Sequence, residues 1–339
     1  MERQARLSML DGWRGISILC VLFGHMLPLG PKALQLNATV ATGGMAIFFC
    51  LSGFLIVSML LRNDNIASFL VRRIFRIIPP AWLFFVVVLP WYHPRTNAWL
   101  ANLLFYANIP PTYLDYGNNH FWSLCVEVQF YVAIAAVVLL LGRRGLILVP
   151  VVCLSVTILR ISYGVPISIF TWLRVDEILA GGSIALIIHH ARLGISQTPI
   201  LAVVPCVLFA LLMASCHPDA ALLAYARPYF AAASVGVTII RRPDALQRLL
   251  CNPVLAYVAE ISYALYVIHP VTYAGWLGQG DTLVRYTKRV VSLVLTFTLA
   301  HISTRYFESR FIRFGHRLAE RIEARPASGS MQSERTGPT

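Results

Sequence analysis

Long apolar segments, each close to the thickness of a lipid bilayer, alternate along the chain with short polar connections. A transmembrane helix needs about 20 predominantly apolar residues, whereas a helix on the surface of a soluble domain keeps one polar face. The pattern therefore predicts an all-α fold, a polytopic transmembrane helix bundle. About ten spans are expected, at 13–29, 40–61, 77–92, 123–141, 145–163, 173–190, 199–215, 222–240, 254–276 and 283–306.

Prolines and one long connection interrupt this regular alternation. The third predicted span begins with Pro79 and Pro80, which suit the first turn of a helix better than its middle. Residues 93–121 form the longest connection, and their aromatic side chains predict an interfacial or re-entrant helix that ends at Pro110 and Pro111.

The composition agrees with a membrane protein. Hydrophobic residues make up 58% of the 339 residues and charged residues 13%, too few charges to cover the surface of a soluble protein of 37.8 kDa. We expect a single membrane domain over residues 1–310. A basic and then polar cytoplasmic tail should follow over residues 311–339, disordered after residue 325 because no apolar period continues there.

The basic charges are distributed unevenly between the two faces that the predicted spans define. With the N-terminus inside, 19 Lys and Arg residues fall on the inner side and 8 on the outer side. The excess predicts that both termini are cytoplasmic, so the net charge of +13 indicates a lipid bilayer rather than nucleic acid as the partner. The seven cysteines form no Cys-x-x-Cys pair, so the sequence signals neither a disulfide framework nor a metal site.

Ionisable residues inside predicted spans are functional candidates, because a charge in lipid is costly. Arg14 and His25 lie eleven residues apart in the first span, so they share nearly one helix face and are separated by about 16 Å along the axis. This arrangement suits a long substrate, with Arg14 at an anionic portion and His25 at the reacting end. Alternatively, Arg14 snorkels to lipid headgroups and His25 hydrogen bonds to a neighbouring helix.

An arginine cluster precedes the third span. Arg72 and Arg76 share a helix face, and Arg73 lies beside them. Guanidinium groups bind phosphates through paired hydrogen bonds, so the cluster predicts a phosphate-binding mouth on the cytoplasmic side. The alternative is an anchor that contacts anionic lipid.

The fourth span begins with Trp122 and Ser123, followed by Glu127 and Tyr131 at one-turn spacing. A carboxylate so close to the outer face is expected to orient a histidine or to bind an acceptor hydroxyl, and the alternative is that it is solvated at the interface.

Two later spans also carry polar groups. Asp176 and Glu177 follow Arg174 at the outer end of the sixth span, where catalysis and a local ion pair explain them equally well. In the ninth span a polar stripe recurs every three residues, for which helix packing is the alternative to substrate binding. Its members are Glu260, Tyr263, Tyr266 and His269.

These residues lie in motifs that resemble, in order and from about residue 8 to 310, those of the acyltransferase family 3 integral-membrane O-acyltransferases. The matching segments are LDGWRGISILCVLFGHM, FFCLSGFLI, RRIFRIIP, FWSLCVEVQFY, RVDEILAGG and ISYALYVIHP. One departure is Arg310, which stands where the last motif of the family has proline. The extracytoplasmic esterase-like domain of some members has no counterpart in this sequence, which is expected to be a stand-alone transferase core.

The resemblance implies that an acyl group, commonly acetyl, moves from cytoplasmic acyl-CoA to a hydroxyl of a carbohydrate or lipid-linked glycan at the cytoplasmic (inner) membrane. Acyl-CoA would be a substrate, with no tightly bound cofactor. His25 would accept the hydroxyl proton, and Glu127 and Arg14 would assist it. The donor-binding residues would be Arg14, Arg72, Arg73, Arg76, Ser52 and Gly53. The acceptor-binding residues would be Trp122, Ser123, Tyr131, Asp176, Glu177, Tyr266 and His269. Ser52 is not expected to form an acyl-enzyme, because no sequence feature pairs it with a base.

Two other classes of protein compete with an acyltransferase. In a carrier or flippase, His25, Glu127 and His269 would line a proton or sugar pathway. In a non-catalytic scaffold, substitutions of Arg14 and His25 would leave the cellular phenotype intact.

Release of CoA distinguishes an enzyme from a carrier. Purified protein in detergent, supplied with acetyl-CoA and a thiol reagent, should release CoA slowly by hydrolysis and faster when a glycan acceptor is added. A carrier would release none, and that result would contradict the enzyme interpretation.

Overall fold

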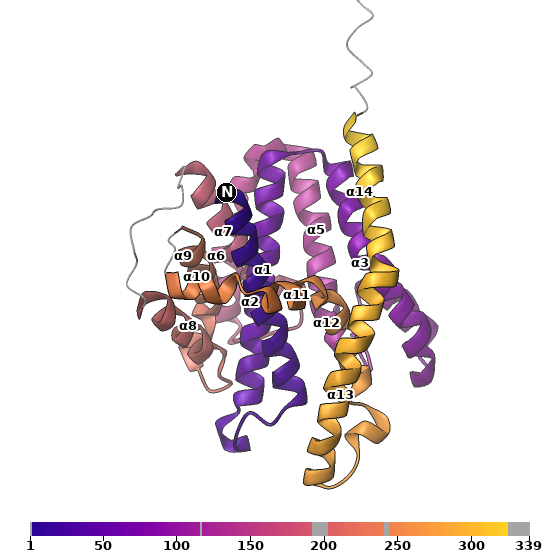
Figure 1. The fold of residues 1–339 in the computed structure, drawn as a ribbon. Helices are drawn as coiled ribbons and strands as arrows, with labels where there is room; N and C mark the ends of the chain where they lie inside the picture. Colours follow the sequence, from indigo (N-terminus) through magenta and orange to yellow (C-terminus); the bar gives the residue numbers. More distant parts are fainter. Residues whose placement is uncertain (1, 116, 192–202, 241–243, 325–339) are drawn as a thin grey trace, which may run out of the picture.

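The computed structural model describes residues 2–115, 117–191, 203–240 and 244–324, and within these ranges it contains helices and turns but no strand. Most helices run roughly side by side, and α10 to α12 cross the middle of the bundle (Figure 1). The all-α prediction is confirmed. The helices are α1 Glu2–Met26, α2 Leu36–Arg62, α3 Ile66–Val88, α4 Thr96–Leu103, α5 Trp122–Leu141, α6 Leu148–Ser162, α7 Asp176–His190, α8 Val203–Cys216, α9 Arg227–Ile240, α10 Asp244–Leu250, α11 Pro253–Glu260, α12 Ser262–Thr272, α13 Thr282–Ile302 and α14 Ser309–Ala324.

Among the described residues, five helical stretches are long and apolar enough to cross a membrane, or six if the bent pair α11–α12 counts as one span. The predicted count of ten spans is therefore not confirmed. Two of the predicted spans correspond to short helices outside these stretches, since α7 has 15 residues and α8 has 14. The five stretches are Lys32–Arg62, Ile66–Tyr92, Asn119–Ser162, Ala221–Ile240 and Thr282–Ala324.

The third predicted span starts earlier than the sequence indicated. α3 begins at Ile66, where the side chain of Asn65 accepts a hydrogen bond from the backbone N–H of Ser68 and caps the helix. Pro79 and Pro80 consequently lie inside α3, so their assignment to its first turn was wrong. The helix continues through them because the preceding residues pack against α14.

The ninth predicted span is broken. α11 and α12 meet at an angle of 70°, so the expected continuous helix over 254–276 is not formed. Asn252 and Pro253 start α11, and the hydroxyl of Ser262 donates to the carbonyl of Ala259 across the break at 2.8 Å. The bend carries α12, with His269, toward the interior of the bundle, where His269 is fully buried.

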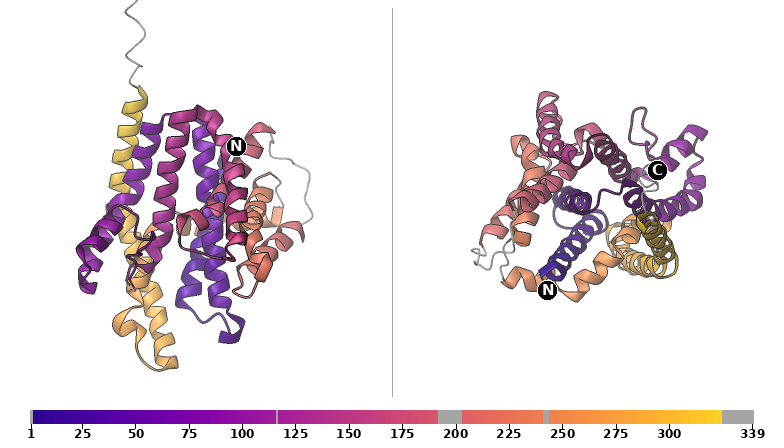
Figure 2. Two further views of the ribbon diagram at one scale, coloured as in Figure 1. Left: turned by 180° about the vertical axis from the view of Figure 1, so that it is seen from behind. Right: turned by 90° about the horizontal axis from the view of Figure 1, so that it is seen from above.

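The tenth predicted span continues past its expected end. A π-helical turn over Ser303–Glu308 joins α13 to α14, which lies along α3 (Figure 2). The rings of Phe75 and Phe314 are 5.1 Å apart, and Gly315 leaves room for Phe75. Residues 311–324, expected to be a tail, therefore form a packed helix, whereas the disorder expected after residue 325 falls outside the described residues. The start of α1 and the end of α14 lie at the same end of the bundle (Figure 1).

Glycines bring α2 and α7 into backbone contact. A Cβ on Gly53 would lie 1.7 Å from the carbonyl oxygen of Ile178, and one on Gly181 would lie 1.9 Å from that of Cys50. Small residues allow such close approach in membrane bundles, where van der Waals packing drives helix association. Gly53, which was expected to contact the donor, thus packs against the backbone of α7.

Replacing Gly53 by alanine should destabilise the fold by at least about 1–3 kcal/mol, because the new methyl group meets rigid backbone. The measurement is thermal unfolding in detergent together with the yield of monodisperse protein. Gly236→Ala is the matched control, since the nearest atoms to its Cβ would be side-chain atoms of Ile184, the closest at 3.2 Å. Equal stability of the two variants would contradict this account of the α2–α7 contact.

Candidate active site

A cavity of about 750 Å³ is lined by arginines from α1, α2 and α3. We call it the arginine pocket. Its guanidinium groups outnumber its carboxylates, which belong to Asp11 and Glu323. Such an excess of donors and positive charge suits an anionic ligand with several phosphates. The guanidinium groups are those of Arg14, Arg62, Arg72, Arg73 and Arg76.

Two of these five arginines form salt bridges among the described residues and three do not. Arg14 bonds to Asp11 at 3.3 Å, and Arg72 bonds to Glu323 of α14 at 2.8 Å. Among the described residues no carboxylate forms a salt bridge with Arg73 or Arg76. The sequence cluster on α3 therefore lines a cavity together with Arg14, the grouping that the family resemblance implied.

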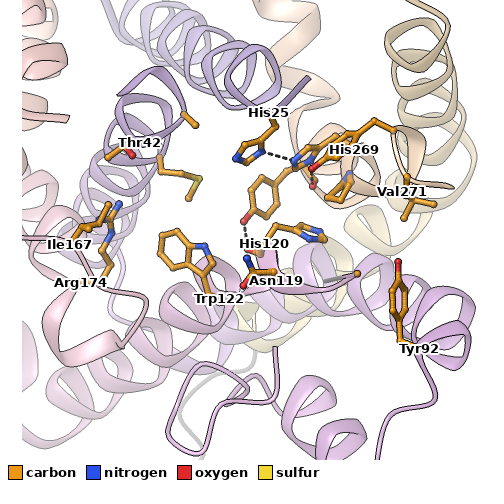
Figure 3. A pocket seen from close by; sticks show the side chains of 17 residues that line it. His25, Thr42, Tyr92, Asn119, His120, Trp122, Ile167, Arg174, His269 and Val271 are labelled. Carbon is orange, nitrogen blue, oxygen red and sulfur yellow. Dashed lines mark hydrogen bonds between the residues drawn. The ribbon is translucent and has the colours of Figure 1, made fainter. Parts of the chain in front are cut away.

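A second cavity, of about 280 Å³, is lined by three histidines from distant parts of the chain. We call it the histidine pocket. His25 comes from the end of α1, His269 from α12, and His120 from the short 3-10 turn before α5 (Figure 3). The imidazole of His25 is exposed in the pocket, whereas that of His269 is fully buried behind it.

A chain of hydrogen bonds fixes the protons on these rings. Nδ1 of His269 lies 2.7 Å from the carbonyl oxygen of Tyr266, which can only accept, so Nδ1 carries the proton. In the neutral ring Nε2 is then an acceptor. It lies 3.0 Å from Nδ1 of His25, which must donate to it. Nε2 of neutral His25 therefore keeps an unprotonated lone pair, which is the form that a general base requires.

The turn before α5 is tied to α12. The hydroxyl of Tyr266 donates to the carbonyl of His120 and lies 2.5 Å from the hydroxyl of Ser123. Tyr266 and Trp122 line the histidine pocket, but Ser123 does not. Ser123, expected to bind the acceptor, thus has a positioning contact, and its contact with an acceptor stays a prediction.

Glu127 does not meet His25. Its carboxylate accepts a hydrogen bond from the hydroxyl of Ser52 at 2.7 Å and another from Tyr131. The guanidinium of Arg73 lies 5.7 Å from the centre of the Tyr131 ring, which links this group to the arginine pocket. We call Ser52, Glu127 and Tyr131 the polar divider, because Ser52 lies on α2 between the stretches that line the two pockets.

The divider changes two expectations from the sequence. Glu127 was expected to steer the acceptor or orient His25, but His269 is the group that holds His25. Ser52 was expected to lack a base partner, whereas its hydroxyl donates to Glu127. His25 and His269, like Ser52 and Glu127, lie on helices far apart in sequence, so spacing along one helix does not reveal either pair.

Asp176 and Glu177 are fully buried in ion pairs and line neither pocket. Arg160 bonds to Asp176 at 2.5 Å, and Arg174 and Arg227 both contact Glu177. Acceptor binding by the two acids stays a prediction. Arg174, which the sequence offered only as their partner, does line the histidine pocket.

The helix α1 contributes a side chain to each of the two cavities. α1 presents Arg14 to a cavity suited to phosphates and His25 to a cavity with a basic nitrogen. A group bound at one cavity and a hydroxyl bound at the other are therefore held by a single rigid element.

Comparison with known proteins agrees with this geometry. Residues 8–305 match the model of an acyltransferase domain. Over 56% of this chain, 29% of residues are identical to a Bacillus subtilis protein provisionally named peptidoglycan O-acetyltransferase YrhL, of which the chain covers 34%. Over 88% of this chain, 24% are identical to the peptidoglycan O-acetyltransferase OatA of Listeria monocytogenes, of which it covers 55%.

The chain thus spans between a third and about half of the length of these two relatives. No solved structure matches it. Because the acyltransferase domain model covers most of the chain, the protein belongs to this acyltransferase family.

Proposed function

We propose that the protein is a membrane O-acyltransferase that moves an acyl group, such as acetyl, from acyl-CoA in the arginine pocket to a glycan hydroxyl in the histidine pocket. The observation that carries the proposal is the unprotonated Nε2 of His25, exposed in one pocket, on the helix that presents Arg14 to the other. Family membership and the names of the relatives support the same reaction.

The arginine pocket suits the donor. CoA carries several phosphates, and Arg73 and Arg76 have no carboxylate partner among the described residues, so their charges are available to it. The predicted excess of Lys and Arg on the side of the termini favours a cytoplasmic position for this pocket. Cytoplasmic acyl-CoA would then enter between α1, α2 and α3.

The histidine pocket suits the acceptor. Trp122, Tyr92 and Tyr266 supply aromatic surface, and Asn119 supplies polar groups that a sugar ring can bind. The volume of about 280 Å³ fits a small part of a larger ligand, such as one sugar unit. A surface or exported glycan is the proposed acceptor, and peptidoglycan is the candidate that the names of the relatives suggest.

The chemistry follows from the protons on the histidines. Nε2 of His25 takes the proton of the acceptor hydroxyl as the oxygen attacks the thioester carbonyl. The tetrahedral intermediate collapses, the carbon–sulfur bond breaks, and the thiolate of CoA takes the proton. His269 stabilises the positive charge on His25 during the step, because its Nε2 accepts the hydrogen bond from Nδ1 of His25.

The two pockets must communicate for the thioester to reach His25. Arg14 and His25 are about 16 Å apart along α1. Ser52 of the polar divider lies between the α2 stretches that line the two pockets, so the proposed path of the polar pantetheine arm runs past the hydroxyl and carboxylate groups of the divider. Gly53 is occupied by α7, so Ser52 rather than Gly53 is the proposed contact on α2.

His25→Ala should lower acceptor-dependent release of CoA by about 10²- to 10⁴-fold, the range typical of losing a general base. The assay uses purified protein, acetyl-CoA and a peptidoglycan fragment. His217→Ala serves as the control, since His217 lies outside both pockets. A correctly folded His25→Ala protein that works at the wild-type rate would refute the proposed base.

The double variant Arg73→Gln, Arg76→Gln should raise KM for acetyl-CoA by about tenfold or more, since charged hydrogen bonds to phosphate are lost. The defect should shrink with S-acetyl-N-acetylcysteamine, a thioester that lacks the phosphates. Arg313→Gln on α14 is the control for loss of surface charge. An unchanged KM for acetyl-CoA would contradict the assignment of the donor pocket.

A further inference from the structure

Five charged residues near the histidine pocket form a buried ion cluster. Each of their side chains is at most 2% exposed. Arg160 bonds to Asp176 at 2.5 Å, Arg227 to Glu177 at 2.6 Å, and Arg174 to Glu177 at 3.3 Å. The members are Arg160, Arg174, Asp176, Glu177 and Arg227.

The cluster has three guanidinium groups for two carboxylates, so one positive charge is not balanced. Burying an unbalanced charge away from water costs free energy, and buried charges are therefore normally paired. The extra positive charge of the cluster therefore calls for an anionic partner outside it.

The surplus rests on Arg174. Arg160 has Asp176 to itself, and Arg227 makes the shorter of the two contacts with Glu177. Arg174 makes the longest contact of the three, and its Nε and Nη1 have no hydrogen-bond partner among the described residues. Arg174 therefore carries the positive charge that the two carboxylates of the cluster do not balance, and two of its nitrogens have N–H groups without an acceptor among the described residues.

Arg174 forms part of the wall of the histidine pocket. In Figure 3 it lies on the side away from His269, with Trp122 between them in that view. Its guanidinium lies 5.2 Å from the centre of the Trp122 ring and 5.9 Å from that of Phe49, so aromatic faces hold it in place. No carboxylate belongs to the described residues that line this pocket, so nothing there neutralises the charge.

We propose that Arg174 is an anion-binding subsite that takes a carboxylate of the acceptor, so that the pocket selects an acidic sugar over a neutral one. A carboxylate carries the single negative charge that balances the cluster, and it accepts from the two free donors. Shielding from water strengthens such a bond. The inference rests on the proposed function, since it assigns the acceptor class to the same pocket.

The direct test compares the binding of methyl β-D-glucuronide with that of methyl β-D-glucoside to the purified protein in detergent, by titration calorimetry without any acyl donor. The glucuronide should bind about tenfold or more tightly, as expected for a shielded charged hydrogen bond. Equal affinities, or binding of neither sugar, would overturn the proposal. Dimethyl phosphate is a third arm, and if it displaces the glucuronide at lower concentration, the carboxylate assignment is wrong.

Variants connect the preference to this residue. Arg174→Gln should abolish the discrimination between the two glycosides, while the remaining cluster keeps two balanced pairs and the fold. Arg174→Lys should keep part of the preference, and it replaces the glutamine variant if that protein does not fold. Arg227→Lys, a control that keeps the charge and does not line the pocket, should behave as wild type.

A full preference for the glucuronide in Arg174→Gln would overturn the assignment. Because no acyl donor is present, this outcome is independent of whether the protein releases CoA. Loss of the proposed function and loss of the proposed subsite are therefore observed separately.

Discussion

A charged or hydrogen-bonding group that is shut away from water must find a partner within the protein, and this constraint organises the bundle. The carboxylate of Glu127 meets it by accepting from Ser52 and Tyr131. Asp176 and Glu177 meet it through Arg160 of α6, Arg227 of α9 and Arg174 of the turn before α7. Some groups that do not meet it line the two cavities, namely Nε of Arg72 and Arg73 in the arginine pocket and two nitrogens of Arg174 in the histidine pocket, so these cavities can bind polar ligands.

The same constraint acts within α12. Pro270 has no N–H to donate to the carbonyl of Tyr266 four residues earlier, and this carbonyl accepts from Nδ1 of His269 instead. That bond sets the proton on His269, and His269 sets the proton on His25. The basic nitrogen in the pocket therefore depends on a backbone carbonyl two hydrogen bonds away.

Local periodicity and spacing predicted the helical class and the shared face of Arg72 and Arg76, whereas the grouping of Arg14 with the α3 arginines was implied by the resemblance to the family. It did not predict that His269 rather than Glu127 holds His25, since these residues are brought together by packing between helices distant in sequence. Hydropathy also could not show the 70° bend or the prolines inside α3, because an apolar run has the same composition whether it is straight or broken. The role proposed for Arg174 could not be predicted from the sequence for another reason. Its surplus charge is visible only once every neighbouring acid has been assigned to a partner.

The central claim is that one α1 helix serves a donor and an acceptor that reach it from opposite sides of the membrane. Proteoliposomes test it most directly, with acetyl-CoA supplied only outside and a peptidoglycan fragment trapped inside. The account predicts acetylated fragment in the lumen, formed by the molecules whose arginine pocket faces outward. Acetylation only when donor and acceptor share one compartment would contradict it.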